Sequence, residues 1–133
     1  MSAVINNRLI DSELVLKQHS ATPITTTTAE TAILVYPRNH LNYKAIIDIG
    51  AYAATGTYEL TIEVSDALNG TYSTMSVLTD AVIKNNGQNS SFELPLSGHQ
   101  AFATDADCLY VRINATLGGT TPSLAYGSFL TVI

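Results

Sequence analysis

Three histidines are the residues of this chain whose type most readily supports proton transfer or metal binding. They are His19, His40 and His99. No two of them, and no histidine with the single cysteine Cys108, have a spacing typical of a zinc site, such as His-x-x-x-His. We therefore interpret all three as solvent-exposed loop residues and predict no zinc site.

The lone cysteine and the nearby acidic residues also lack a recognisable arrangement. Cys108 follows Asp107, and an adjacent carboxylate opposes formation of a reactive thiolate. Asp105 and Asp107, with Asp80 elsewhere, could offer oxygens to calcium. A calcium ion takes six to eight oxygen ligands, and this segment lacks the glycine and glutamate of an EF-hand loop. We expect Cys108 to be a half-buried, small apolar residue and predict no metal ion.

A pair of glutamates on one predicted strand is the remaining candidate for acid–base catalysis. Glu59 and Glu63 are four residues apart, which on a strand separates them by about 13 Å. Paired glycosidase carboxylates are closer together than that. No Gly-x-Ser-x-Gly nucleophile motif and no phosphate-binding loop occurs. The sequence predicts no catalytic residue and no cofactor, and we expect that the protein is not an enzyme.

Charge and composition restrict the possible partners. The chain has six basic and eleven acidic residues, a net charge of −5, and no basic patch, so we expect no nucleic-acid binding. Charged residues make up only 13% of the chain, about half the usual share. Such a surface suits packing against other protein, because few ions need desolvation, but a strand-rich protein that tolerates few charges fits equally well.

Membrane and secretion signals are missing from the sequence. No apolar run approaches the ~18 residues that a membrane-spanning helix needs, so we expect no membrane association. The first ten residues do not resemble a signal peptide, because Asn6, Asn7 and Arg8 interrupt the apolar stretch. One cysteine cannot form an internal disulfide, so we expect synthesis in a reducing cytoplasm.

The elements that would position any site are predicted to be strands. Residues 57–65 alternate apolar and polar side chains, which predicts a strand with Tyr58, Leu60, Ile62 and Val64 on the buried face. A turn at Asn69-Gly70 should join it in a hairpin to residues 72–79. Further strands are predicted at residues 32–36, 43–51, 91–96, 109–115 and 124–133. Pro95 places the strand of residues 91–96 at an edge of its sheet, or ends it.

Several short strands separated by turn residues indicate an all-β fold. We predict an antiparallel β-sandwich, jelly-roll-like, with about seven or eight strands and an N-terminal arm. The sandwich domain would span residues 31–133. Residues 1–30 would form either an arm that packs on a neighbour, or a first strand followed by a Thr-rich linker. Within them, residues 9–18 fit a strand or one or two helical turns.

The order of these segments resembles the small jelly-roll cement, or decoration, proteins on the capsids of tailed bacteriophages. A short N-terminal segment with Leu9-Ile10-Asp11-Ser12 leads into the Thr-rich residues 22–31. The strand of residues 57–66 and the turn Asn69-Gly70-Thr71 come next, and a late strand, residues 109–115, follows. The resemblance spans most of the chain.

The resemblance implies a virion structural protein that binds the outside of an assembled capsid and stabilises contacts between major capsid subunits. Its partners would be the major capsid protein and other copies of itself, as a dimer or trimer, on the exterior of the virion. The N-terminal segment would make the contacts, through Arg8, Leu9, Ile10, Leu14 and Leu16. The alternative is a carbohydrate- or receptor-binding β-sandwich module of a phage tail or fibre. That alternative needs a concave site with an exposed aromatic ring, whereas a cement protein needs a flat apolar patch.

Overall fold

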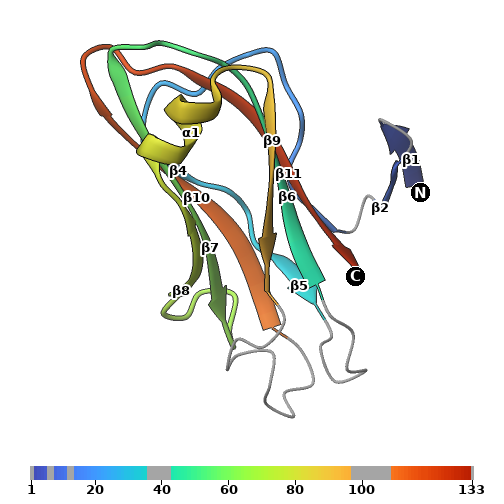
Figure 1. Cartoon of the computed structure of the whole chain (residues 1–133). Helices are drawn as coiled ribbons and strands as arrows, with labels where there is room; N and C mark the ends of the chain where they lie inside the picture. The colour runs from blue at the N-terminus through green and yellow to red at the C-terminus, as the bar shows by residue number, and fades with distance from the viewer. Residues whose placement is uncertain (1, 6–7, 12–13, 36–42, 97–108, 133) are drawn as a thin grey trace.

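Two antiparallel β-sheets face each other in the computed structural model and enclose the hydrophobic core (Figure 1). The structure describes residues 2–5, 8–11, 14–35, 43–96 and 109–132. The prediction of an all-β, antiparallel sandwich is confirmed. No helix in these ranges is long and apolar enough to cross a membrane.

One sheet has four strands and the other five. The four-stranded sheet has the order β3-β11-β6-β9, with bounds Val15–Lys17, Leu124–Val132, Tyr43–Tyr52 and Ser90–Pro95. The five-stranded sheet has the order β4-β10-β7-β8, with bounds Thr28–Ala29, Leu109–Gly119, Gly56–Ser65 and Ser73–Leu78. Its fifth strand, β5 (Ile33–Val35), also pairs with β10. Strand β9 is at a sheet edge, as Pro95 indicated.

The pairing of the strands is nested. β3 pairs with β11, β4 and β5 pair with β10, β6 pairs with β9, and β7 pairs with β8. Successive pairs alternate between the two sheets, which is the arrangement of a jelly roll, a long hairpin wrapped into a sandwich. Counted as one interrupted strand, β4 and β5 leave four strands in each sheet.

Alternating side chains of the central strands build the core. Tyr58, Leu60, Ile62 and Val64 of β7 are buried, as their period of two predicted. Across the pairing, β10 contributes a matching row of buried residues, Val111, Ile113 and Ala115. The row that faces them comes from the four-stranded sheet and includes Ala45, Ile47 and Leu130. Each of these strands therefore buries at least one full face.

One short helix, α1 (Asp80–Asn86), connects β8 to β9. The helix includes Asn85 and Asn86, although asparagine favours turns and loops. Gly87 has a positive φ of 82° and ends the helix. Thr79 caps the other end by accepting a hydrogen bond from the backbone N–H of Val82.

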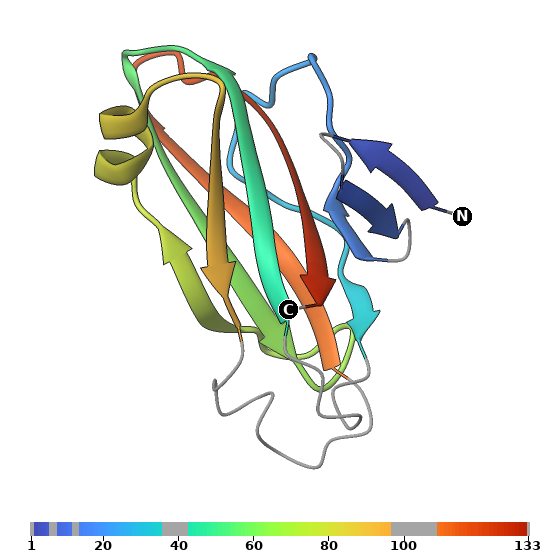
Figure 2. The same cartoon turned by 45° about the vertical axis from the view of Figure 1, so that its right-hand side comes forward.

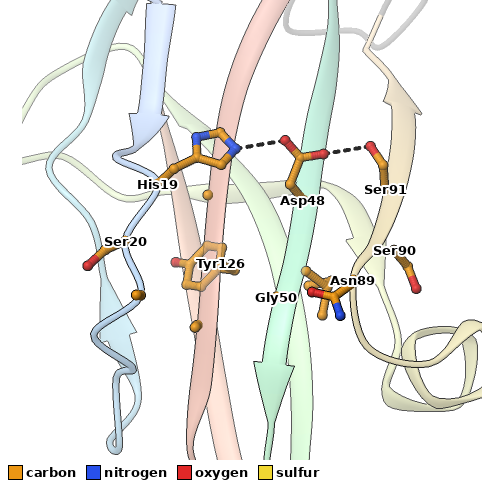
Figure 3. Close-up of a pocket in the computed structure, with 12 residues that line it drawn as sticks. His19, Ser20, Asp48, Gly50, Asn89, Ser90, Ser91 and Tyr126 are labelled. Carbon is orange, nitrogen blue, oxygen red and sulfur yellow. Dashed lines mark hydrogen bonds and ion pairs between the residues drawn. The ribbon is translucent and has the colours of Figure 1, made fainter. Parts of the chain in front are cut away.

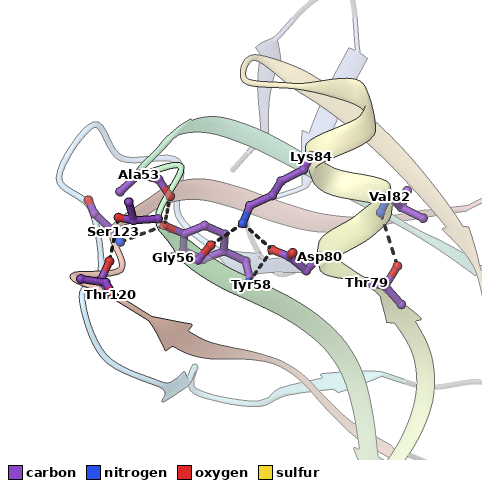
Figure 4. A network of polar contacts seen from close by, with 10 residues as sticks. Ala53, Gly56, Tyr58, Thr79, Asp80, Val82, Lys84, Thr120 and Ser123 are labelled. Atoms are coloured by element: carbon purple, nitrogen blue, oxygen red, sulfur yellow. Dashed lines mark hydrogen bonds and ion pairs between the residues drawn. The ribbon is translucent and has the colours of Figure 1, made fainter.

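Polar contacts fasten α1 to the end of β7 (Figure 4). Asp80 Oδ1 accepts a hydrogen bond from the backbone N–H of Tyr58 at 2.9 Å. Lys84 lies 3.4 Å from the same oxygen and donates to the carbonyl of Gly56. The buried Ile83 completes the attachment. The helix is therefore a fixed part of the sandwich, although seven residues are too few to be stable alone.

The N-terminal segment contains strands rather than helical turns. β1 (Ser2–Ile5) and β2 (Arg8–Asp11) form a hairpin that belongs to neither sheet of the sandwich. Figure 2 shows this hairpin outside the sandwich, on the side of β3 and β11. β3 then joins the four-stranded sheet, and its Leu16 lies in the core. Residues 1–30 thus hold both an outlying hairpin and an edge strand of the sandwich.

Candidate functional site

A groove of about 500 Å³, lined by both polar and apolar groups, lies on the outer face of the four-stranded sheet. Its rim carries His19 and Ser20 from the segment that follows β3, Asp48 from β6, and Asn89 and Ser91 from the start of β9 (Figure 3). A volume of this size is within the range of small-molecule sites.

Asp48 is the centre of a hydrogen-bonded row across the groove. Its Oδ2 lies 2.7 Å from Nε2 of His19, and its Oδ1 accepts a hydrogen bond of 2.6 Å from the hydroxyl of Ser91. These contacts join three separate segments of the chain (Figure 3). Both carboxylate oxygens are held, so the carboxylate has a fixed orientation, and each oxygen keeps a lone pair for a further donor.

The strand register explains why these residues meet. Asp48 of β6 lies opposite Ser91 of β9 on one side and Gly127 of β11 on the other. Because paired residues of neighbouring strands point to the same face, Ser91 reaches Asp48 directly. Glycine at position 127 leaves space for the His19 ring. The groove is therefore produced by the sheet, and the segment that follows β3 forms only one of its walls.

The row of His19, Asp48 and Ser91 is not a nucleophilic triad. In a triad the histidine lies between the serine and the acid and takes the serine proton. Here the carboxylate lies in the middle, and the serine hydroxyl is bonded to the acid. No group of three or more His, Cys, Asp or Glu within the described ranges could hold a metal ion. The arrangement is suited to binding a ligand by hydrogen bonds.

Beside the groove, the same outer face carries an apolar patch, defined here as Val15, Ile46 and Phe129. Ile46 and Phe129 are opposite each other in the register of β6 and β11. They are only 0% and 3% exposed although they point away from the sandwich core. The ring of Phe129 also lies 6.3 Å from that of His19. β2 approaches β11 from this side, so the outlying hairpin and the apolar patch belong to one region.

Tyr126 borders the groove but is 98% buried, since only 2% of it is exposed. Its hydroxyl has no hydrogen-bond partner among the described residues. Burial, and secondly the Glu30 carboxylate, raise the pKa of this hydroxyl above its ordinary value. The ammonium group of Lys17 lies 5.5 Å from the ring centroid. An unpaired buried hydroxyl is costly, so Tyr126 is a weak point in the packing of β11.

The outer face of the five-stranded sheet has a different character, with few uncompensated charges. Arg112 of β10 donates to Glu63 of β7 at 2.8 Å, and its guanidinium lies 3.9 Å from the ring centroid of Tyr72. Thr57, Glu59 and Thr61 share this face of β7. The ion pair leaves only 16% of the Glu63 side chain exposed.

The residues that the sequence singled out as partner contacts have different surroundings. Arg8, Leu9 and Ile10 are in β2 of the hairpin. Leu14 packs partly buried against the sandwich core, and Leu16 is a core residue with 3% exposure. The side chain of Leu16 is therefore not accessible to a partner of the folded chain.

The histidines, the cysteine and the aspartates that the sequence singled out for possible chemistry do not form one site among the described residues. His19 does lie in a loop, as predicted, but its side chain is only 33% exposed and is bonded to Asp48. His40, His99, Cys108, Asp105 and Asp107 lie outside the described residues. Asp80 accepts a hydrogen bond from the backbone N–H of Tyr58 instead of collecting with other acids. The importance of Asp48 could not be read from the sequence, because its partners are distant along the chain.

No protein-family model matches the chain, and a search of curated proteins finds no match.

Proposed function

We propose that this protein is a virion structural protein that binds the outside of an assembled bacteriophage capsid and stabilises contacts between major capsid subunits. It would act as a dimer or trimer. The observation that carries the proposal is the N-terminal hairpin, which stands outside a complete jelly-roll sandwich. The resemblance of the chain to capsid cement proteins gives the class of partner.

Among the described residues, the hairpin approaches the sandwich mainly through β2 and β11, and a two-stranded hairpin is marginally stable in water, so a further surface would stabilise it. β1 and β2 bond to each other and to no other strand that the structure describes. The outer edges of such a hairpin offer backbone N–H and C=O groups that can extend the sheet of a neighbouring molecule. A protein that joins neighbouring shell subunits needs an outlying element of this kind in addition to its folded body.

The sandwich itself offers a broad surface with little charge to desolvate. On the outer face of the five-stranded sheet, Glu63 is neutralised by Arg112, which stacks on Tyr72. Protein interfaces favour tyrosine and arginine and disfavour unpaired charges. Many identical copies on one shell add avidity, so each contact can be weak. Both features support docking on protein.

Co-sedimentation tests the proposal. The purified chain is mixed with expanded phage capsids that lack it, assembled from the major capsid protein of the same phage. We expect saturable binding at a fixed ratio to the major capsid subunit, and capsids that withstand a higher temperature. A chain lacking residues 2–11 should bind at least tenfold more weakly. Absence of binding by the full chain, with capsid stability unchanged, would overturn the proposal.

A further inference from the structure

We infer that the groove around Asp48 is a binding site for a neutral, hydroxyl-rich ligand, a short saccharide. The inference is independent of capsid binding, because the groove and the hairpin are separate structures. It concerns the second function that the sequence left open, a carbohydrate-binding module.

The groups that face the groove select the ligand chemistry. Asp48 supplies acceptor oxygens, and the hydroxyl of Ser91, already donating to Asp48, can accept a bond. Asn89 supplies both a donor and an acceptor, since no hydrogen bond among the described residues engages its side-chain amide. The Nε2 atom of His19 is bonded to Asp48, and the other nitrogen of the same ring can form a further hydrogen bond. The set is mixed, with donors and acceptors interleaved.

A mixed set of this kind excludes simple ions. An anion such as phosphate needs donors and would meet the carboxylate of Asp48. A cation needs acceptors, and the groove offers one carboxylate that already serves His19 and Ser91. Sugar hydroxyls both donate and accept, so they can use every group that lines the rim.

The floor of the groove permits a close approach. Gly50 of β6 has no side chain, and Ala125 of β11 adds only a methyl group, whereas the space above Gly127 is filled by the His19 ring. A ligand can therefore lie almost directly on the sheet, as close backbone approach generally requires glycine. Asn89 has a φ of 60°, a conformation that costs energy for a residue other than glycine and is held here by its backbone N–H bond to the Gly50 carbonyl.

The site lacks the strongest contribution to sugar affinity. Tyr126 borders the groove but its ring is buried, so the half-exposed imidazole of His19 is the ring that can stack on a sugar. We expect a dissociation constant on the order of 1 mM for a single site. Several copies of the chain on one particle would raise the effective affinity.

Titration of the ¹⁵N-labelled full chain with a panel of neutral di- and trisaccharides, followed by amide chemical shifts, tests the inference. At least one sugar should shift the amide signals of Gly50, Asn89 and Gly127 saturably. Asp48→Asn should weaken that sugar at least tenfold. Glu59→Gln, which removes the same charge from the opposite sheet, should leave it unchanged.

Two further arms make the result decisive. If Asp48→Asn does not fold, Ser91→Ala is used in its place, because the Ser91→Ala substitution removes only one exposed hydroxyl. Inorganic phosphate and guanidinium chloride are titrated as ionic probes. The inference is overturned if no sugar moves these three signals at a concentration 50-fold above the expected dissociation constant. It is also overturned if phosphate or guanidinium binds in the groove more tightly than any sugar. Equal affinity of the Asp48 and Glu59 variants for the sugar would overturn it as well. Capsid co-sedimentation by the same variants reports separately on the proposed function.

Discussion

The imidazole ring of His19 occupies the space into which a side chain at position 127 would project. A Cβ atom built on Gly127 would lie only 2.4 Å from Cγ of His19. Gly127 is also the register partner of Asp48, the residue to which the ring is bonded. The absence of one side chain in β11 thus allows the segment after β3 to reach across the sheet and form the wall of the groove.

Replacement of Gly127 by alanine should therefore displace His19 and break its bond to Asp48. We expect the free energy of unfolding to fall by about 1 kcal/mol, as overpacking typically costs. Urea unfolding measures the free energy, and the imidazole NMR signals report the ring position. Gly118→Ala is the control, because its Cβ would meet only the movable hydroxyl of Thr57. An unchanged His19 spectrum in Gly127→Ala would contradict this account of the groove.

Removal of the buried Tyr126 hydroxyl should not harm the fold. The hydroxyl has no partner among the described residues, so Tyr126→Phe should leave the free energy of unfolding unchanged or raise it by about 1 kcal/mol. Tyr58→Phe should lower it by about 1 kcal/mol, because that hydroxyl donates to the Ala53 carbonyl and accepts from the N–H of Ser123. Thermal and urea unfolding of both variants measure the difference. Equal losses would show that the Tyr126 hydroxyl is in fact paired.

Stability should decline at alkaline pH in a manner that depends on Tyr126. Because burial raises the pKa of its hydroxyl in the folded state, the unfolded chain loses that proton first, near its ordinary pKa of 10.0. The contribution of this group is fully present below pH 10 and decreases as the pH rises above it. The loss of stability between pH 9 and pH 11 should be smaller in Tyr126→Phe than in the wild type. Parallel pH profiles would contradict the assignment.

Two truncations should separate the hairpin from the sandwich. Removal of residues 2–11 takes away β1 and β2 only, and we expect a folded chain with a cooperative unfolding transition. Removal of residues 2–22 also takes away β3 and the buried Leu16, whose loss alone should cost about 2–5 kcal/mol. Circular dichroism during heating compares the two. A chain that fails to fold without residues 2–11 would make the hairpin part of the core.

The sequence predicted the parts of the fold that depend on local patterns. Alternation in residues 57–65 identified the core face of β7, and Pro95 correctly placed β9 at an edge. Helix α1 was not predicted, because its seven residues cover less than two full periods of a helical pattern. Ile46 lies on the same face of β6 as Lys44 and Asp48, so the sequence pattern places it on the polar side of the strand. The folded structure shows that the Ile46 side chain is nevertheless buried there, against Phe129 and Val15.

The groove could not have been found from the sequence. His19 and Asp48 are 29 residues apart, and Asp48 and Ser91 are 43 residues apart. They meet because β6 lies between β11 and β9, and such an order depends on long-range pairing that no local pattern encodes. The one local signal was the placement of Asp48 on the polar side of its strand.

A cryo-electron microscopy reconstruction of capsids saturated with the chain tests the proposed function most directly. We predict density for the sandwich on the outer surface, where major capsid subunits meet, with residues 2–11 in contact with a neighbouring subunit. A capsid surface without this density, or a sandwich bound only at the tail or its fibres, would contradict the proposal.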